Sequence, residues 1–161
     1  GLWYYEQIMQ GYNYRLTDFQ AALLISQLNK MDIFSTRRKE ISKRYDEAFA
    51  AFDLVTLQRD IPESDTTRHL YILNLNLEKL SVTRKEIHDA LRAENICCNV
   101  HYIPVYYQPF YEKLGYKKGL CPQAEKLYER ILSIPFYYSM TDEDVESVIE
   151  GVYKVVRYYR K

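Results

Sequence analysis

The sequence lacks an excess of charge of either sign. Its 22 basic side chains are matched by 22 acidic ones. A nucleic-acid-binding domain ordinarily carries a basic patch or stripe, and this balance provides none. Long apolar runs are lacking too, since none approaches the roughly 20 residues that a membrane-spanning helix needs. We therefore expect no nucleic-acid partner and no membrane partner.

Glycine and paired metal ligands are also scarce. The five glycines are not clustered, so there is no glycine-rich loop to hold a phosphate. Cys97, Cys98 and Cys121 lack the paired spacing of a zinc site, and their odd number favours reduced, buried thiols over a disulfide framework. No G-x-S-x-G nucleophile motif occurs. These absences predict no bound metal and no serine or cysteine nucleophile.

The 161 residues suffice for one domain with its own core. The chain begins at Gly1 without a methionine and shows no apolar segment typical of a signal peptide. We therefore expect it to be a piece of a longer protein, and the cysteine usage predicts a cytoplasmic location.

Tyrosine is the one residue type in clear excess, with 17 copies against one tryptophan and six phenylalanines. Its apolar ring and polar hydroxyl suit clefts and subunit interfaces. Compositional drift in an AT-rich genome explains the excess equally well, and the sequence leaves both interpretations open.

Hydrophobic periodicity predicts helices over much of the chain. Thr17 and Gln20 have capping-box spacing ahead of a buried helix over about 17–30, with apolar residues at Phe19, Ala22 and Leu23. After a bend near 31–35, a second helix carries one apolar stripe: Ile41, Tyr45, Ala48, Phe49 and Phe52. Start signals at 83, 122 and 141 predict three more helices, and the one from 122 should bury Ala124, Leu127, Tyr128 and Ile131.

Three segments are typical of strands: LVTLQ (54–58), RHLYILNLNL (68–77) and ICCNVHY (96–102). The second alternates apolar and polar residues almost perfectly, as a half-buried strand does. The mixture predicts an α+β fold with a small, mostly antiparallel three-stranded sheet covered by helices on one face. A tyrosine-rich extended lead-in, residues 1–16, should precede a single domain over 17–161.

Two places carry candidate binding residues. Asn13 and Arg15 stand one turn before the helix cap, and an amide beside a guanidinium suits an anionic group. A surface loop ahead of a cap is an equally open interpretation. His101 ends a predicted strand just before Pro104, where folds often place functional side chains, although a lone histidine is more often structural.

A resemblance to a known family is carried by five segments in order: GYNYRLTDFQAALLISQLNKMD, RRKEISKRYDEAF, VHYIPV, QPFY and AEKLYERILSIPFYYSMTDEDVESVIE. Over essentially the whole chain they resemble the C-terminal part of the DegT/DnrJ/EryC1/StrS sugar aminotransferases. The resemblance implies the small C-terminal domain of the aspartate-aminotransferase (type I PLP) fold. Within the family the chain looks most like enzymes that place an amino group at C4 of a nucleotide-linked keto-sugar, with glutamate as donor.

The resemblance also implies roles for particular residues. In such enzymes the active site lies between the two subunits of a homodimer, and the loop matching 11–15 reaches into the partner's site. Asn13 is then expected to bind the phosphate of pyridoxal 5'-phosphate (PLP) held by the partner subunit. The expected substrate-binding residues are Arg15, Tyr14, His101, Tyr102 and Tyr106.

The same family carries its Schiff-base lysine in a large N-terminal domain, which matches nothing in this sequence. We therefore expect no catalytic residue in this chain, no PLP bound to it alone and no activity of the chain by itself. The whole protein is expected to be a PLP-dependent nucleotide-sugar aminotransferase in surface polysaccharide or glycan biosynthesis. The alternative is a non-catalytic α+β protein-interaction domain, and a lysine in the upstream reading frame would discriminate between them.

Overall fold

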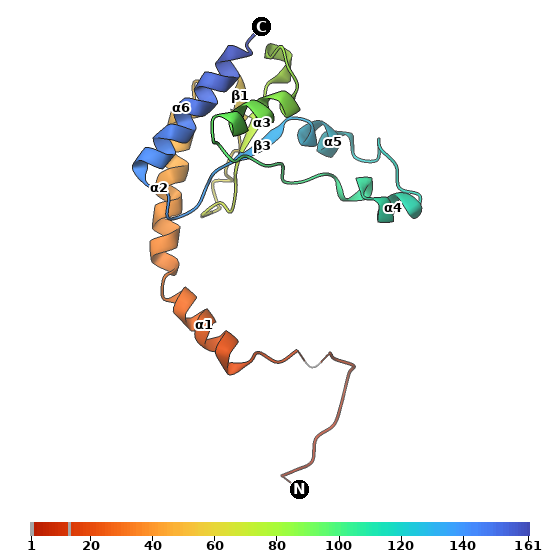
Figure 1. Cartoon of the computed structure of the whole chain (residues 1–161). Helices are drawn as coiled ribbons and strands as arrows, with labels where there is room; N and C mark the ends of the chain where they lie inside the picture. The colour runs from red at the N-terminus through yellow and green to blue at the C-terminus, as the bar shows by residue number, and fades with distance from the viewer. Residues whose placement is uncertain (1, 13) are drawn as a thin grey trace. The chain divides into compact units, whose positions relative to one another are not determined.

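The computed structural model describes residues 2–12 and 14–161. These divide into two compact units, Gly1–Ile33 and Phe34–Lys161 (Figure 1). The helix α2 (Met31–Phe49) begins at the end of the first unit and continues through the second.

The first unit consists of an extended lead-in and the helix α1 (Asp18–Leu28). The predicted capping box is confirmed, because the Thr17 side chain accepts from the Gln20 backbone while the Gln20 side chain accepts from the Thr17 backbone. The predicted burial is wrong for this chain: Phe19, Ala22 and Leu23 are all exposed, Phe19 by 81%. An 11-residue helix beside an extended segment has nothing within its own unit to bury an apolar face. Periodicity predicts that a helix has an apolar face, but it does not predict which other segment packs on that face. The break before α2 falls at 29–30, ahead of the predicted bend.

The second unit is built on a three-stranded antiparallel sheet in the order β1-β2-β3, which confirms the predicted fold class. The strands are β1 (Val55–Leu57), β2 (Tyr71–Leu75) and β3 (Ile131–Ile134). In the register, Thr56 and Ile131 both pair with Asn74, and Ser133 pairs with Ile72. These five side chains therefore share one face of the sheet.

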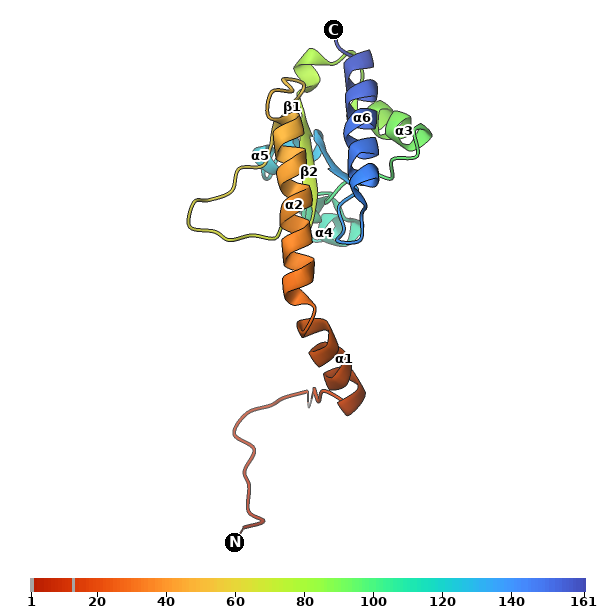
Figure 2. The same cartoon turned by 90° about the vertical axis from the view of Figure 1, so that its left-hand side faces the viewer.

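The opposite face of the sheet belongs to the hydrophobic core. Along β2, Tyr71, Leu73 and Leu75 are buried and the residues between them are half-buried, as the predicted alternation requires. The long helices α2 and α6 (Asp142–Tyr158) lie side by side against this core (Figure 2). The predicted apolar stripe of α2 is confirmed, since Ile41, Tyr45 and Phe49 are buried. The buried face of α6 includes Val145, Val148, Ile149, Val152 and Val155.

Shorter elements complete the unit. A capping box at Thr83 and Glu86 opens α3 (Arg84–Ala93), as predicted, and Ile87 and Leu91 of α3 join the core. A 3-10 turn, η1 (Leu77–Lys79), follows β2, and a second, η2 (Val105–Tyr107), leads into α4 (Pro109–Lys113). The helix α5 (Pro122–Tyr128) begins at the predicted proline.

The identity of the third strand was predicted wrongly. Segment 96–102 forms only a single bridge, from Asn99 to Ser133, and β3 comes instead from residues expected in the helix that starts at Pro122. All four residues of β3 are buried, so the segment has no alternation that would distinguish a central strand from a buried helical turn. Because α5 ends before β3, Ala124 and Leu127 are exposed rather than buried.

Two of the three cysteines also differ from expectation. Cys98 is buried, as predicted, and burial raises the pKa of its thiol to about 11. Cys97 and Cys121 are exposed. The buried segment that was expected to enclose both Cys97 and Cys98 is largely irregular chain, so only one of the two side chains turns inward.

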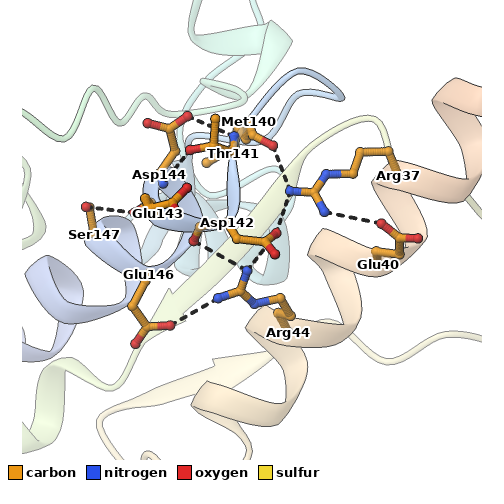
Figure 3. Close-up of polar contacts among 10 residues, drawn as sticks. All are labelled: Arg37, Glu40, Arg44, Met140, Thr141, Asp142, Glu143, Asp144, Glu146 and Ser147. Carbon is orange, nitrogen blue, oxygen red and sulfur yellow. Dashed lines mark hydrogen bonds and ion pairs between the residues drawn. The ribbon is translucent and has the colours of Figure 1, made fainter.

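A cluster of charged side chains joins α2 to the start of α6 (Figure 3). Arg37 Nη2 donates to the Met140 carbonyl at 2.7 Å and to Asp142 Oδ1 at 2.8 Å. Arg44 contacts the same Asp142 oxygen at 3.0 Å and Glu146 Oε2 at 3.1 Å. The two arginines of α2 thus hold the first turn of α6, where acidic side chains also complement the helix dipole.

Candidate active-site residues

The predicted binding residues fall in both units: positions 13–15 belong to the first, and His101, Tyr102 and Tyr106 belong to the second. Asn13 lies outside the described residues. Tyr14 and Arg15 are exposed, and the Tyr14 ring stacks on Tyr12 with 5.5 Å between centroids. Tyr14, Arg15, Leu16 and Gln20 line a shallow hollow at the N-terminus of α1. Within residues 2–12 and 14–161, no acidic side chain pairs with Arg15.

An exposed guanidinium without an acidic partner keeps its donors available for an anion. Arginine offers a planar fork of N–H groups that matches carboxylate and phosphate oxygens. The helix N-terminus one turn away adds a positive dipole end. The chemistry of this end of the chain therefore suits a phosphate or carboxylate group, as the sequence predicted.

In the second unit, His101 borders a hollow of about 240 Å³ over the sheet face that does not pack on the core. The hollow is lined by Thr56 and Leu57 of β1, Gln58, Ile72 and Asn74 of β2, Ile131 of β3, Leu127 of α5 and His101. The His101 Nδ1 atom lies 2.8 Å from Ser133 Oγ on β3. Strand residues thus form the floor of the hollow, and the His101 ring is held at its edge.

One polar atom in the floor has no partner among the described residues. Asn74 Oδ1 is buried and makes no hydrogen bond there. A buried acceptor without a donor costs free energy, and such groups are rare in folded proteins. The floor is therefore not fully satisfied by the chain's own groups.

The predicted residues Tyr102 and Tyr106 have different surroundings. Tyr102 is exposed and packs edge-on against the His101 ring, with 4.6 Å between centroids. Tyr106 donates instead to Glu125 Oε1 at 2.7 Å, and the Gly119 N–H donates to the same oxygen at 2.7 Å. Partial burial and the Glu125 bond raise the pKa of Tyr106 to about 12, and the Tyr106 bond lowers the pKa of Glu125. The structure therefore brings His101 and Tyr102 together and ties Tyr106 to α5.

Sequence reasoning missed Ser133, Asn74 and Glu125. Ser133 and Glu125 stand in a segment that was expected to be one continuous helix, and each meets its partner only through the fold. Asn74 was recognised as a strand residue, but its orientation over the hollow depends on β1 and β3.

The structure also bears on lysines, metal-binding groups and membrane-spanning helices. Every lysine of the chain is exposed. Across the part of the chain that the structure describes, no group of three or more His, Cys, Asp or Glu side chains is arranged to hold a metal ion. Among the same residues, no helix has the length and apolar character needed to cross a membrane.

The model of the DegT/DnrJ/EryC1/StrS aminotransferase family matches residues 3–153. The chain belongs to this family. It is 42% identical over 160 residues to the uncharacterized protein MJ1066 of Methanocaldococcus jannaschii, covering 97% of this chain and 41% of that one. It is also 42% identical over 159 residues to the spore coat polysaccharide biosynthesis protein SpsC of Bacillus subtilis, covering 98% of this chain and 41% of that one.

Solved structures of sugar aminotransferases share the fold. The putative sugar aminotransferase Spr1654 of Streptococcus pneumoniae, in its PLP form, matches with a TM-score of 0.85 at 30% identity, over 97% of this chain and 40% of that one. PseC of Helicobacter pylori, an aminotransferase involved in the biosynthesis of pseudoaminic acid, matches with a TM-score of 0.84 at 27% identity, over 96% of this chain and 41% of that one. The chain thus spans about two-fifths of the length of its relatives.

Proposed function

We propose that this chain forms the C-terminal part of a PLP-dependent aminotransferase acting on a nucleotide-linked 4-keto-6-deoxy sugar, with glutamate as amino donor. The observation that carries the proposal is the family match over residues 3–153. It is supported by the structural match, over 97% of the chain, to a sugar aminotransferase in its PLP form. SpsC acts in spore coat polysaccharide biosynthesis and PseC in the biosynthesis of pseudoaminic acid, which supports a place in surface polysaccharide or glycan synthesis.

The residues of this chain fit the anionic ligands of such an enzyme. PLP supplies an electron sink for amino transfer when it is bound. The exposed Arg15 guanidinium, beside a helix N-terminus, offers donors suited to phosphate or carboxylate oxygens. Every lysine is exposed, so none has the desolvated surroundings that activate an amine. We assign the lysine that holds the cofactor to a part of the protein outside this chain.

In this proposal Asn13 and Arg15 bind different ligands. By the family resemblance, Asn13 donates to the cofactor phosphate of the partner subunit in a homodimer. Arg15 binds the anionic substrate or donor, and His101, Tyr102 and Tyr106 border the sugar-nucleotide cleft. The chain's contribution is to bind and orient ligands, since none of these residues is assigned a covalent step.

The direct test uses the full-length protein that contains this chain. With PLP, glutamate and a panel of nucleotide-linked 4-keto-6-deoxy sugars, one amino sugar should form for each 2-oxoglutarate released. The 161-residue chain alone should give no product and should retain no cofactor after dialysis. No amino transfer by the full-length protein to any keto-sugar would overturn the proposal, and a lysine of this chain labelled by borohydride reduction would overturn the lysine assignment.

Single substitutions in the same protein test the separate ligand assignments of Asn13 and Arg15. Asn13→Ala should weaken PLP binding roughly ten- to a hundredfold, the range expected for one hydrogen bond to a charged acceptor. Arg15→Ala should leave PLP binding nearly unchanged and raise the KM for the donor or the sugar nucleotide. Heterodimers of an Arg15→Ala subunit and a subunit lacking the cofactor lysine should recover one working site in two. Inactive heterodimers would exclude action across the subunit boundary.

A further inference from the structure

Ser133 is an unusual residue in its strand. It lies in β3 between Leu132 and Ile134 and is only 5% exposed. Ser133 and Ser42 are the only buried polar residues among those the structure describes. A hydroxyl in such a position is unfavourable unless it forms a hydrogen bond. The side chain that provides this bond is His101.

Ser133 and His101 lie within hydrogen-bonding distance of each other. Ser133 Oγ lies 2.8 Å from His101 Nδ1 and has no other hydrogen-bond partner in residues 2–12 and 14–161. Nδ1 is the one acceptor within reach of the hydroxyl proton, and a hydroxyl that donates to Nδ1 requires the ring proton of the neutral tautomer to be on Nε2. The backbones are tied together as well, because Asn99 and Ser133 exchange N–H···O bonds of 3.0 and 2.8 Å. The ring is thus anchored through both its own nitrogen and the chain two residues before it.

The anchored ring stands at the edge of the 240 Å³ hollow. The other ring nitrogen, Nε2, forms no hydrogen bond within the described part of the chain. We infer that Ser133 is a positioning residue. It holds His101 in one tautomer and orientation, so that Nε2–H donates to an oxygen of the sugar-nucleotide substrate at this hollow. The identity of the ligand rests on the proposed function, whereas the Ser133–His101 relation does not.

The relation is tested without any assay of activity. The chain has three histidines, so a sample labelled with ¹⁵N-histidine gives a spectrum in which each ring can be assigned. In the 161-residue chain, His101 should carry its proton on Nε2 and show an Nδ1 signal shifted by hydrogen bonding. Ser133→Ala should move that Nδ1 signal toward the value of a free ring and leave His69 and His88 in place. Ser133→Thr, which keeps the hydroxyl, should preserve it.

Ser42→Ala is the matched control, because it removes a buried hydroxyl from α2. It should leave the His101 signals unchanged. An unchanged His101 spectrum in Ser133→Ala, or a wild-type proton on Nδ1, would overturn the inference. If Ser133→Ala does not fold, Ser133→Cys gives the same comparison, since a thiol keeps the volume and is a weak donor.

The consequence for the reaction is tested in the full-length enzyme. Ser133→Ala should lower kcat/KM for the keto-sugar nucleotide by about three- to tenfold, mainly through KM, which is the effect of losing one neutral hydrogen bond. Ser133→Thr should restore most of it, and Ser42→Ala should match the wild type. Equal losses in the alanine and threonine variants would contradict the positioning role. A wild-type enzyme that transfers no amino group, with the histidine spectra as expected, would refute the proposed function and leave the Ser133–His101 relation standing.

Discussion

Tyr45 shows how a single side chain serves both the core and a polar bond. Its ring is fully buried and meets the Tyr71 ring edge-on at 4.9 Å, while its hydroxyl donates to the Pro135 carbonyl at 2.9 Å. Burial raises the pKa of this phenol, so the hydroxyl stays protonated over the ordinary pH range. Tyr45→Phe keeps the packing and leaves the Pro135 carbonyl without its donor. We expect the free energy of unfolding to fall by about 1–2 kcal/mol at pH 7, measured by urea denaturation.

Tyr158→Phe is the control at the same scale, since Tyr158 is 81% exposed. It should change stability by less than about 0.5 kcal/mol. The pH dependence follows from the raised pKa of Tyr45. Its contribution is fully present below the pKa of an unfolded tyrosine, about 10, and is lost as the pH rises beyond that value. Equal stabilities of Tyr45→Phe and the wild type at pH 7 would show that the Pro135 bond contributes nothing.

The candidate site could be predicted from the sequence only where a residue type signals its own use. Arg15 was singled out because a guanidinium ahead of a capped helix is not needed for the cap, and its role stays a prediction. His101 was found because a proline follows it closely. Ser133 carries no such signal, since its role depends on a histidine brought to it by the Asn99 bridge. Contacts made through the fold are therefore the part of the site that local patterns leave out.

At the scale of elements, one carboxylate, that of Asp142, is shared by two arginines at the junction of α2 and α6. Hydrogen bonding from Arg37, with the nearby charge of Arg44, lowers the pKa of Asp142. Asp142→Asn should lower the melting temperature at pH 7, because Arg37 and Arg44 each lose one of their two anionic partners. A carboxylate with a depressed pKa stabilises the fold above its unfolded pKa, about 3.9, and the stabilisation is lost as the pH falls through the lower folded value. The melting temperatures of variant and wild type should therefore converge in acid.

Glu143→Gln is the matched control for that measurement. Glu143 occupies the same first turn of α6, and in the described residues its carboxylate forms no ion pair. Both substitutions remove one negative charge from the helix N-terminus, so the difference between them isolates the arginine contacts. Equal shifts in melting temperature at pH 7 would show that the helix dipole alone accounts for the effect.

The elements that could be predicted are those with a regular hydrophobic periodicity or a helix-capping motif. The capping boxes of α1, α3 and α6, the stripe of α2 and the alternation of β2 were all found from the sequence. The third strand could not be found, because Ile131–Ile134 is buried on both faces and follows directly on a helix. Its strand state is decided by pairing with β2, a partner far away in the chain.

At the scale of the whole molecule, the first unit exposes many large apolar side chains. Its exposed apolar side chains include Leu2, Trp3, Tyr4, Tyr5, Ile8, Met9, Phe19, Leu23, Leu24, Ile25 and Leu28. Contiguous apolar patches larger than a few hundred Å² mark surfaces that another body covers. Under the proposed function, that body is the rest of the enzyme and its partner subunit. In the isolated 161-residue chain, that body is absent, and a second copy of the chain can cover the apolar side chains.

We therefore expect the isolated chain to self-associate, with a sedimentation coefficient that rises with concentration in the micromolar range. Phe19→Gln with Leu23→Gln should shift it toward the monomer, because both residues are exposed on α1 and glutamine preserves the helix. Ile61→Gln is the control, since Ile61 is equally apolar and exposed but belongs to the second unit. It should leave the association unchanged. A wild-type chain that sediments as a monomer throughout, with backbone amides of the lead-in protected from hydrogen exchange, would show that the first unit covers its own apolar surface.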